Sequence, residues 1–204
     1  MPATRPTPPD YGPSWKPDFG KNVIILDSTD TDTFQERVRR LTSVSQVQTQ
    51  DGSEFGNDRY AVLIKSGTYQ DLFIDVGYYM TIHGLGSSPD DVQINGLVQS
   101  PGSSNPATKG LALNNFWRGV ENVSITPRSR DGTGNPVNKW AVSQATFLRR
   151  FHMCQGGEFW LWDLDKNWGA GFSSGGFIAD SLFDVEVNAA SQQQFLTRNS
   201  TLNG

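Results

Sequence analysis

The period of the hydrophobic pattern changes about a quarter of the way along the chain. In residues 31–44, Phe34, Val38 and Leu41 recur at the spacing of one helix face. A short apolar run, "NVIILD", precedes this segment. After a polar loop the apolar residues come in runs such as "YAVLIKSGTY" and "DDVQINGLVQ", which are bounded by Gly, Pro, Ser and Asp. The pattern therefore predicts a largely β protein with one helix near its beginning.

Three of the β segments share one template: apolar, two other residues, apolar, polar, apolar. The template starts at Val120, Leu148 and Leu182, so its starts are 28 and 34 residues apart. A strand-rich repeat of this length predicts the stacked coils of a β-solenoid, and the helix at 31–44 would cap its first coil. A β-sandwich or jelly roll is the alternative, although it does not account for the repeated template.

Stacking the three segments in register produces two columns of polar residues on the outer face, with neighbouring strands about 4.8 Å apart. The columns are Asn122, Arg150, Asp184 and Ser124, His152, Glu186. This register places Arg150 beside Asp184 and His152 beside Glu186. Such a patch contains acid, base and substrate-positioning groups. A ladder of ion pairs on a solvated face is the alternative interpretation.

The segment "EFWLWDLDKNWG" (158–169) is the densest cluster of carboxylates and tryptophans. In a strand, Asp163 and Asp165 point to the same side and lie roughly 6.5–7 Å apart, a separation typical of inverting glycoside hydrolases. Trp160, Trp162 and Trp168 are natural platforms for sugar rings. The alternative is an Asp-rich turn whose tryptophans pack at the edge of a coil.

The segment "SQQQFLTRNS" near the end of the sequence is the third candidate. Alternation places Gln192 and Gln194 on the same face. Inward-facing glutamines would form amide ladders along the stack. Outward-facing glutamines, together with Arg198 and Asn199, would hydrogen-bond sugar hydroxyls or a carboxylate.

Composition argues against several classes of function and partner. The net charge is −4 and no Lys/Arg cluster exceeds a pair, which argues against nucleic acid as a partner. No apolar window reaches the length of a membrane span. One cysteine, Cys154, excludes a disulfide framework, and two well-separated histidines do not predict a metal site. We expect an extracellular protein whose signal peptide has been removed, with a cytoplasmic location left open.

Several motifs occur together in a known family. In order, they are "EFGNDRYAVLIKSGTY", "VGYYMTIHGLGSSPDDVQING", "FWRGVENVSITP", "WAVSQATFLRRFHM", "SGGFIADS" and "SQQQFLTRNS". Over residues 22–200 the chain resembles large secreted proteins of fungi and actinobacteria with a pectate-lyase-like right-handed parallel β-helix, often labelled adenylyl cyclase or coagulation factor 5/8-type. The resemblance implies an all-β right-handed parallel β-helix with an N-terminal capping helix. It also implies carbohydrate-active chemistry, with a glycoside hydrolase ahead of a polysaccharide lyase.

We therefore expect a Pro-rich extended arm over residues 1–20 and one β-helix domain over 21–204, with truncation at its C-terminal end left open. The expected activity is hydrolysis of cell-wall polysaccharide, without a cofactor; Ca²⁺ enters only for a lyase. The alternative is a non-catalytic glycan-binding or scaffold module, in which a second copy or another chain covers the open end. The candidate catalytic residues are Asp163, Asp165, Asp180 and Glu186. The candidate substrate-binding residues are Trp160, Trp162, Trp168, Arg150, His152, Gln192, Gln194, Arg198 and Asn199.

Overall fold

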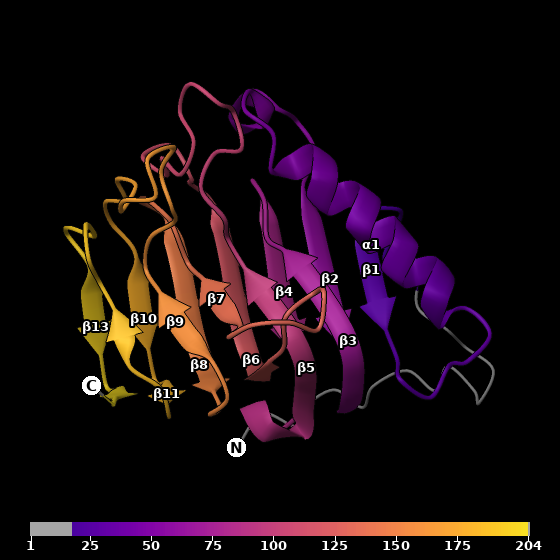
Figure 1. Ribbon diagram of the computed structural model, residues 1–204. Coiled ribbons are helices and arrows are strands. Elements are labelled where there is room, and N and C mark those ends of the chain that lie inside the picture. Colours follow the sequence, from indigo (N-terminus) through magenta and orange to yellow (C-terminus); the bar gives the residue numbers. More distant parts are fainter. Residues whose placement is uncertain (1–17, 204) are drawn as a thin grey trace, which may run out of the picture.

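The chain folds into parallel β-sheets with few helices, as its β-rich pattern predicts (Figure 1). The computed structural model describes residues 18–203. Residues 1–17 of the expected Pro-rich arm lie outside the described residues, and residues 18–20 have no regular secondary structure. Within the described part of the chain, no helix has both the length and the apolar character needed to cross a membrane.

Eleven strands form the large sheet and three form a smaller one. The strands of the large sheet are β1 (Val23–Leu26), β2 (Tyr60–Ile64), β3 (Gly67–Asp75), β4 (Met80–Gly84), β5 (Val92–Gln99), β6 (Arg118–Pro127), β8 (Thr146–Met153), β10 (Phe177–Ala179), β11 (Leu182–Phe183), β13 (Leu196–Arg198) and β14 (Thr201–Leu202). The strands of the smaller sheet are β7 (Val137–Lys139), β9 (Glu158–Trp160) and β12 (Val187–Asn188). The helices are α1 (Phe34–Gln48) and the 3₁₀ turns η1 (Ser53–Phe55) and η2 (Pro89–Asp91).

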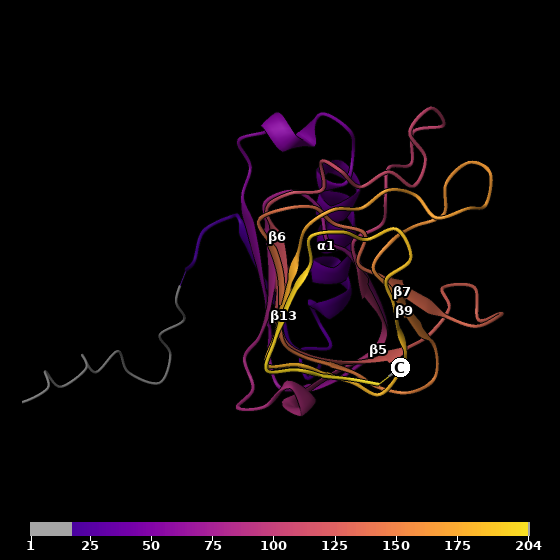
Figure 2. The same cartoon turned by 90° about the vertical axis from the view of Figure 1, so that its left-hand side faces the viewer.

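The main path through the large sheet follows the order β1-β2-β4-β6-β8-β10-β13, and each of these neighbours is parallel. Parallel neighbours require a crossover connection, so the chain leaves the path after each strand and returns beside it. Viewed from the end that carries β13, the β6 and β13 side lies opposite β5, β7 and β9, with α1 behind (Figure 2). The chain therefore encloses a core between two strand-bearing faces.

The core consists of rows of aliphatic side chains at matching strand positions. Strand registers align one such row, and each of its members is at most 1% exposed: Ile24, Val62, Ile82, Val120, Leu148 and Ile178. Burying one aliphatic side chain of this size contributes about 1.5–3 kcal/mol. Each strand supplies one side chain to the row, and that side chain is buried against those of the neighbouring strands. The strands therefore stabilise one another.

Helix α1 confirms the helical pattern of residues 31–44. It lies against β1 and β3, at the end of the path where the described chain begins (Figure 1). Leu41 is buried, and Phe34, Val38 and Val44 pack against the core. The same apolar face that predicted the helix thus attaches it to the sheets.

The predicted register of the three repeat segments is correct for the first pair and wrong for the second. Val120 pairs with Leu148, as the template requires. Leu148, however, pairs with Ile178, and Leu182 pairs with His152, which shifts the last segment by four residues. The template failed because the buried position opposite Phe151 holds Ser181, which a search for apolar residues passes over.

Candidate functional site

The segment that carries Asp163 and Asp165 is a loop, so the strand geometry predicted for this pair is wrong. The side chain of Asp163 accepts hydrogen bonds from the Gly102 amide at 3.0 Å and forms an ion pair with Lys139 at 2.5 Å. The Asp165 carboxylate accepts from the amides of Asn167 and Gly169, both at 2.8 Å. Both carboxylates are engaged in holding the loop, as the turn interpretation describes.

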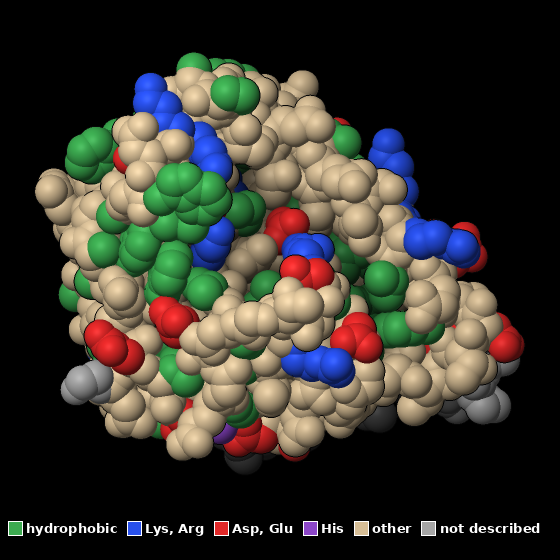
Figure 3. All heavy atoms as spheres, in the orientation of Figure 1, with side chains coloured by type: hydrophobic (Ala, Val, Ile, Leu, Met, Phe, Trp, Pro, Cys, Tyr) green, Lys and Arg blue, Asp and Glu red, His purple; other side chains and the backbone are tan. Residues whose placement is uncertain are grey.

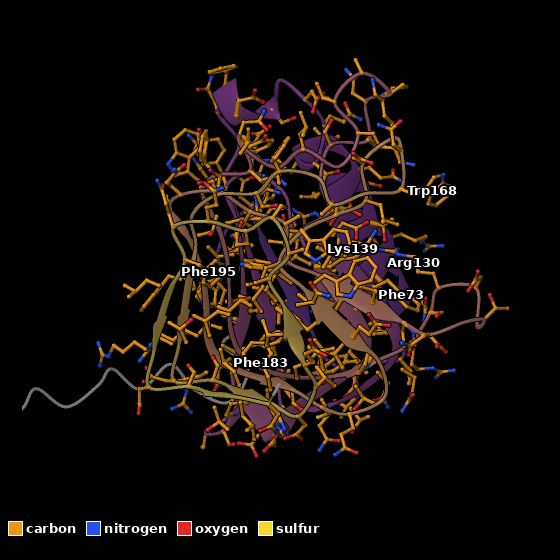
Figure 4. All side chains as sticks on the ribbon, turned by 60° about the vertical axis from the view of Figure 1, so that its left-hand side comes forward. Phe73, Arg130, Lys139, Trp168, Phe183 and Phe195 are labelled. Atoms are coloured by element: carbon orange, nitrogen blue, oxygen red, sulfur yellow. The ribbon has the colours of Figure 1, made fainter. Side chains whose placement is uncertain are left out.

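The predicted tryptophan platforms separate into two groups. Trp160 and Trp162 stack on each other, with ring centroids 4.3 Å apart. Trp168 is 76% exposed, lies beneath the Lys109 ammonium at 5.1 Å, and projects outward in Figure 4. On the face formed by β3, β5, β7 and β9, hydrophobic side chains gather towards β9, beside charged groups that surround a hollow (Figure 3). The loop hollow beside Asp163 has a volume of about 340 Å³.

His152 does not contact Glu186 as predicted. Its ring nitrogens lie 2.6 Å from an Asp90 oxygen and 3.1 Å from an Asp184 oxygen, while Glu186 is exposed. Burial lowers the pKa of the imidazole, but the hydrogen bonds to the two aspartates outweigh burial and raise the pKa above 6.5. His152 therefore joins the η2 turn to the segment after β11 by ionic contacts.

Arg150 contacts Asn122, as the predicted column requires, but it does not lie beside Asp184. Its Nε donates to the Asn122 side chain at 3.0 Å, and its guanidinium also donates to a backbone carbonyl. With the register corrected, the next members of this column are Asp180 and Asn199, and the Asn199 amide donates to Asp180 at 2.8 Å. All four residues have left-handed backbone conformations, with φ between 47° and 59°. The column forms one corner of the large sheet.

The glutamine segment contributes both structural and exposed groups. Gln192 donates to the Gly175 carbonyl at 2.6 Å, which is a structural contact. Gln194 is exposed and also has a left-handed backbone conformation, with φ of 55°. Arg198 is exposed on β13, beside Ala179 of β10. The segment thus combines the two roles that its alternation left open.

The outer face of the large sheet carries a charged row that the sequence did not reveal. Register places His83, Glu121 and Arg149 at matching positions on β4, β6 and β8. Arg149 contacts Glu121 on one side and Asp180, at 3.5 Å, on the other. His83 lies 3.6 Å from Glu121. These residues escaped detection because they occupy positions that the repeat template leaves unspecified.

Asp180 is the predicted catalytic residue that lies beside this row. The hydrogen bond from Asn199, together with the positive charges of Arg198 and Arg149, lowers the pKa of Asp180. Asp180 is consequently ionised at neutral pH. It suits the role of a base or of a hydrogen-bond acceptor, and not that of a proton donor.

The charged row lines one half of a groove that we call the outer groove. Its charged half has a volume of about 610 Å³ and includes His83, Glu121 and Arg149. Its aromatic half has a volume of about 510 Å³ and includes Trp117 and Phe147. The two halves meet at Ala61. The arrangement offers ring faces on one side and hydrogen-bonding charges on the other, which suits an amphipathic ligand with many hydroxyl groups.

No group of three or more His, Cys, Asp or Glu side chains within residues 18–203 is arranged to hold a metal ion. The His152 site illustrates the reason, because its two aspartates bind opposite ring nitrogens and do not converge on one point.

The chain is similar to proteins of one class, the β-1,3-glucanases. It is 40% identical over 187 residues to an exo-beta-1,3-glucanase of Streptomyces sp. (strain SirexAA-E / ActE), covering 92% of this chain and 27% of that protein. It is 38% identical over 96 residues to a "Probable glucan endo-1,3-beta-glucosidase" of Arthroderma benhamiae, covering 44% of this chain and 10% of the relative. No protein-family model matches the chain.

Two solved structures of sacteLam55A from Streptomyces sp. SirexAA-E are also similar, both at 38% identity. One has a TM-score of 0.69 and covers 92% of this chain and 31% of that chain. The other, a variant in complex with glucose, has a TM-score of 0.70 and covers 89% of this chain and 29% of that chain. The chain thus spans about a third or less of the proteins it matches.

These relatives correct the family suggested by the motifs. The resemblance to the pectate-lyase-like family of fungi and actinobacteria is wrong, because the relatives over nearly the whole chain are β-1,3-glucanases.

Proposed function

We propose that this chain is a carbohydrate-active module of a glycoside hydrolase and that its substrate is β-1,3-glucan. The observation that carries the proposal is 40% identity with an exo-beta-1,3-glucanase over 92% of the chain. The outer groove supports it, because an aromatic wall beside charged acceptors and donors complements the ring faces and hydroxyl groups of a glucan.

The fold proposal that accompanies this function is a right-handed parallel β-helix formed by residues 21–204, with α1 as its N-terminal cap. Support comes from the parallel pairing along the main path and from the aligned core row. Such a scaffold places equivalent residues of successive coils about 4.8 Å apart. A groove that crosses several coils would therefore run along the sheet and hold a chain-like ligand.

At the outer groove and at its margin, where Asp180 adjoins the charged row through Arg149, we assign binding roles before catalytic ones. Glu121 and Asp180 would accept hydrogen bonds from glucan hydroxyls, and Arg149, which contacts both carboxylates, would hold them in place. Asp180, with its lowered pKa, is suited to act as the ionised carboxylate of a hydrolytic pair. The proposed ligand is a saccharide, bound at an extracellular location and without a cofactor.

The test is hydrolysis of laminarin, a β-1,3-glucan, followed by release of reducing ends, with β-1,4-glucan and pectin as comparison substrates. Reducing ends from laminarin alone support the proposal. We expect Asp180→Asn and Glu121→Gln to lower the activity, whereas Asp165→Asn changes it little because Asp165 only holds its turn. Release from pectin, or equal release from all three polymers, would contradict the proposed substrate.

A non-catalytic glycan-binding module is the second candidate, and one observation favours it. Three of the candidate carboxylates are already engaged: Asp163 by Lys139, Asp165 by backbone amides, and Asp180 by Arg149. Tight binding of laminarin by the chain, with no release of reducing ends, would establish this alternative.

A further inference from the structure

The aromatic half of the outer groove lies at a corner where the strands of the main path begin. The strand registers place six residues at the same corner position: Arg59, Tyr79, Trp117, Ala145, Gly175 and Gln194. The first three carry large side chains and the next two carry almost none. The corner side chains therefore change from large to small after Trp117, although Gln144 lies close to Gly175.

The filled part of the corner is a continuous stack. The Arg59 guanidinium lies 3.3 Å from the centre of the Tyr79 ring. The rings of Tyr79 and Trp117 are nearly parallel, with centroids 5.1 Å apart and an interplanar angle of 7°. Since β2, β4 and β6 are consecutive in the sheet, Arg59 and Trp117 cover opposite faces of Tyr79.

Trp117 is the last ring of the stack, and its indole also contacts the tilted Phe116 ring, with centroids 5.2 Å apart and an interplanar angle of 59°. The corner position after Trp117 is Ala145, whose methyl group is too small to cover an indole, and the position after that is Gly175. Trp117 is 44% exposed, and Ala145 and Phe147 line the hollow beside it. Gln194 comes three strand spacings beyond Trp117, or roughly 14 Å. The hollow that Trp117 and Ala145 line has a volume of about 510 Å³, which is enough for a pyranose ring.

Three residues of this corner share a left-handed backbone conformation. Tyr79, Trp117 and Ala145 have φ values of 58°, 53° and 58°. A left-handed conformation costs a non-glycine residue of this kind about 1–2 kcal/mol, and glycine or asparagine would make the same corner at lower cost. Tyr79 is also fixed by its hydroxyl, which donates to the Glu54 carbonyl at 2.7 Å, so it holds Trp117 on a rigid support.

We propose that the aromatic half of the outer groove is a pyranose subsite, in which a neutral glucosyl ring stacks on the exposed part of the Trp117 indole beside Ala145. The proposal rests on the proposed function for its ligand class. No carboxylate lines this half of the groove among the described residues, so a cationic ligand has no counter-charge there. The charged half of the outer groove adjoins the aromatic half, so a glucan chain stacked on Trp117 would extend towards Glu121 and Arg149.

The test is calorimetric titration of the chain with laminaripentaose, a β-1,3-linked glucose oligomer, and with cellopentaose, its β-1,4-linked counterpart. Trp117→Ala should weaken binding about tenfold, the loss expected for one strong aromatic contact. Trp117→Phe should retain most of the affinity. Phe172→Ala is the matched control, because Phe172 is an exposed aromatic residue that does not line the groove. Circular dichroism confirms that each variant is folded.

The outcomes separate this subsite from the proposed function. Unchanged laminaripentaose binding by Trp117→Ala would overturn the subsite and leave the β-1,3-glucan assignment in place. Binding of cellopentaose alone, lost in Trp117→Ala, would support the subsite and overturn the β-1,3-glucan assignment. Absence of binding to either oligomer, or an equal loss in Phe172→Ala, would overturn the subsite.

Discussion

The shifted register of the last repeat predicts that a small polar side chain, Ser181, stabilises the core. Ser181 is 6% exposed and lies opposite Phe151. Its hydroxyl accepts a hydrogen bond from the Phe151 amide at 3.1 Å and donates to the Ala179 carbonyl at 2.7 Å. Replacing Ser181 with alanine leaves the buried Phe151 amide without an acceptor. An unsatisfied buried group of this kind costs about 1–3 kcal/mol, so we expect about 2 kcal/mol.

The assay is urea unfolding followed by tryptophan fluorescence, with the slope of the transition as a check that the unfolding reaction is unchanged. For a chain of this length, 2 kcal/mol corresponds to a fall in Tm of about 4–8 °C. Ser66→Ala is the control, because Ser66 is exposed. In the register predicted from the repeat template, Val185 would face Phe151 in place of Ser181. A neutral Ser181→Ala together with a large loss in Val185→Ala would refute the structural register.

Three further predictions concern pH, an ion pair and a close approach of two strands. The folded-state pKa of His152 is raised, so the stabilisation by His152 is complete below about pH 6.5 and is lost as pH rises through the folded pKa. The Tm difference between the wild type and His152→Gln should therefore shrink as pH rises through the folded pKa. A Tm difference that stays constant with pH would contradict this prediction. Lys139→Met should lower the free energy of unfolding by about 1–3 kcal/mol, because it leaves the buried Asp163 carboxylate without its ion-pair partner. In urea unfolding, the double variant with Asp163→Asn should recover part of that free energy. No recovery would show that loss of the ion pair is not the cause of the destabilisation. Gly84→Ala should destabilise by about 1–3 kcal/mol, because a Cβ would lie 1.9 Å from the Asn122 carbonyl oxygen; an unchanged Tm would contradict this packing.

The core of the fold was predictable because apolar residues recur along the chain at helix and strand spacing. Helix α1 and the pairing of Val120 with Leu148 followed from hydrophobic periodicity alone. The next pairing did not, since Ser181 satisfies its hydroxyl within the core and so occupies an apolar position without an apolar side chain. One buried polar residue was enough to shift a predicted register by four residues.

The outer groove was less predictable because its members come from different strands. Glu121 and Arg149 are 28 residues apart in the sequence and become neighbours only through strand register. The local cluster of Asp163 and Asp165 was easier to see, but nearness in sequence reflected turn chemistry there. Asp180 and Asn199 were identified as motif residues, and the structure brings their side chains together at the margin of the charged row.

The most direct test of this account is a crystal structure of the chain with laminaripentaose. We predict oligosaccharide density in the outer groove, with one glucosyl ring on the indole of Trp117 and the chain running towards Glu121 and Arg149. Density on the loop hollow beside Asp163 and Lys139, with the outer groove empty, would contradict the central claim.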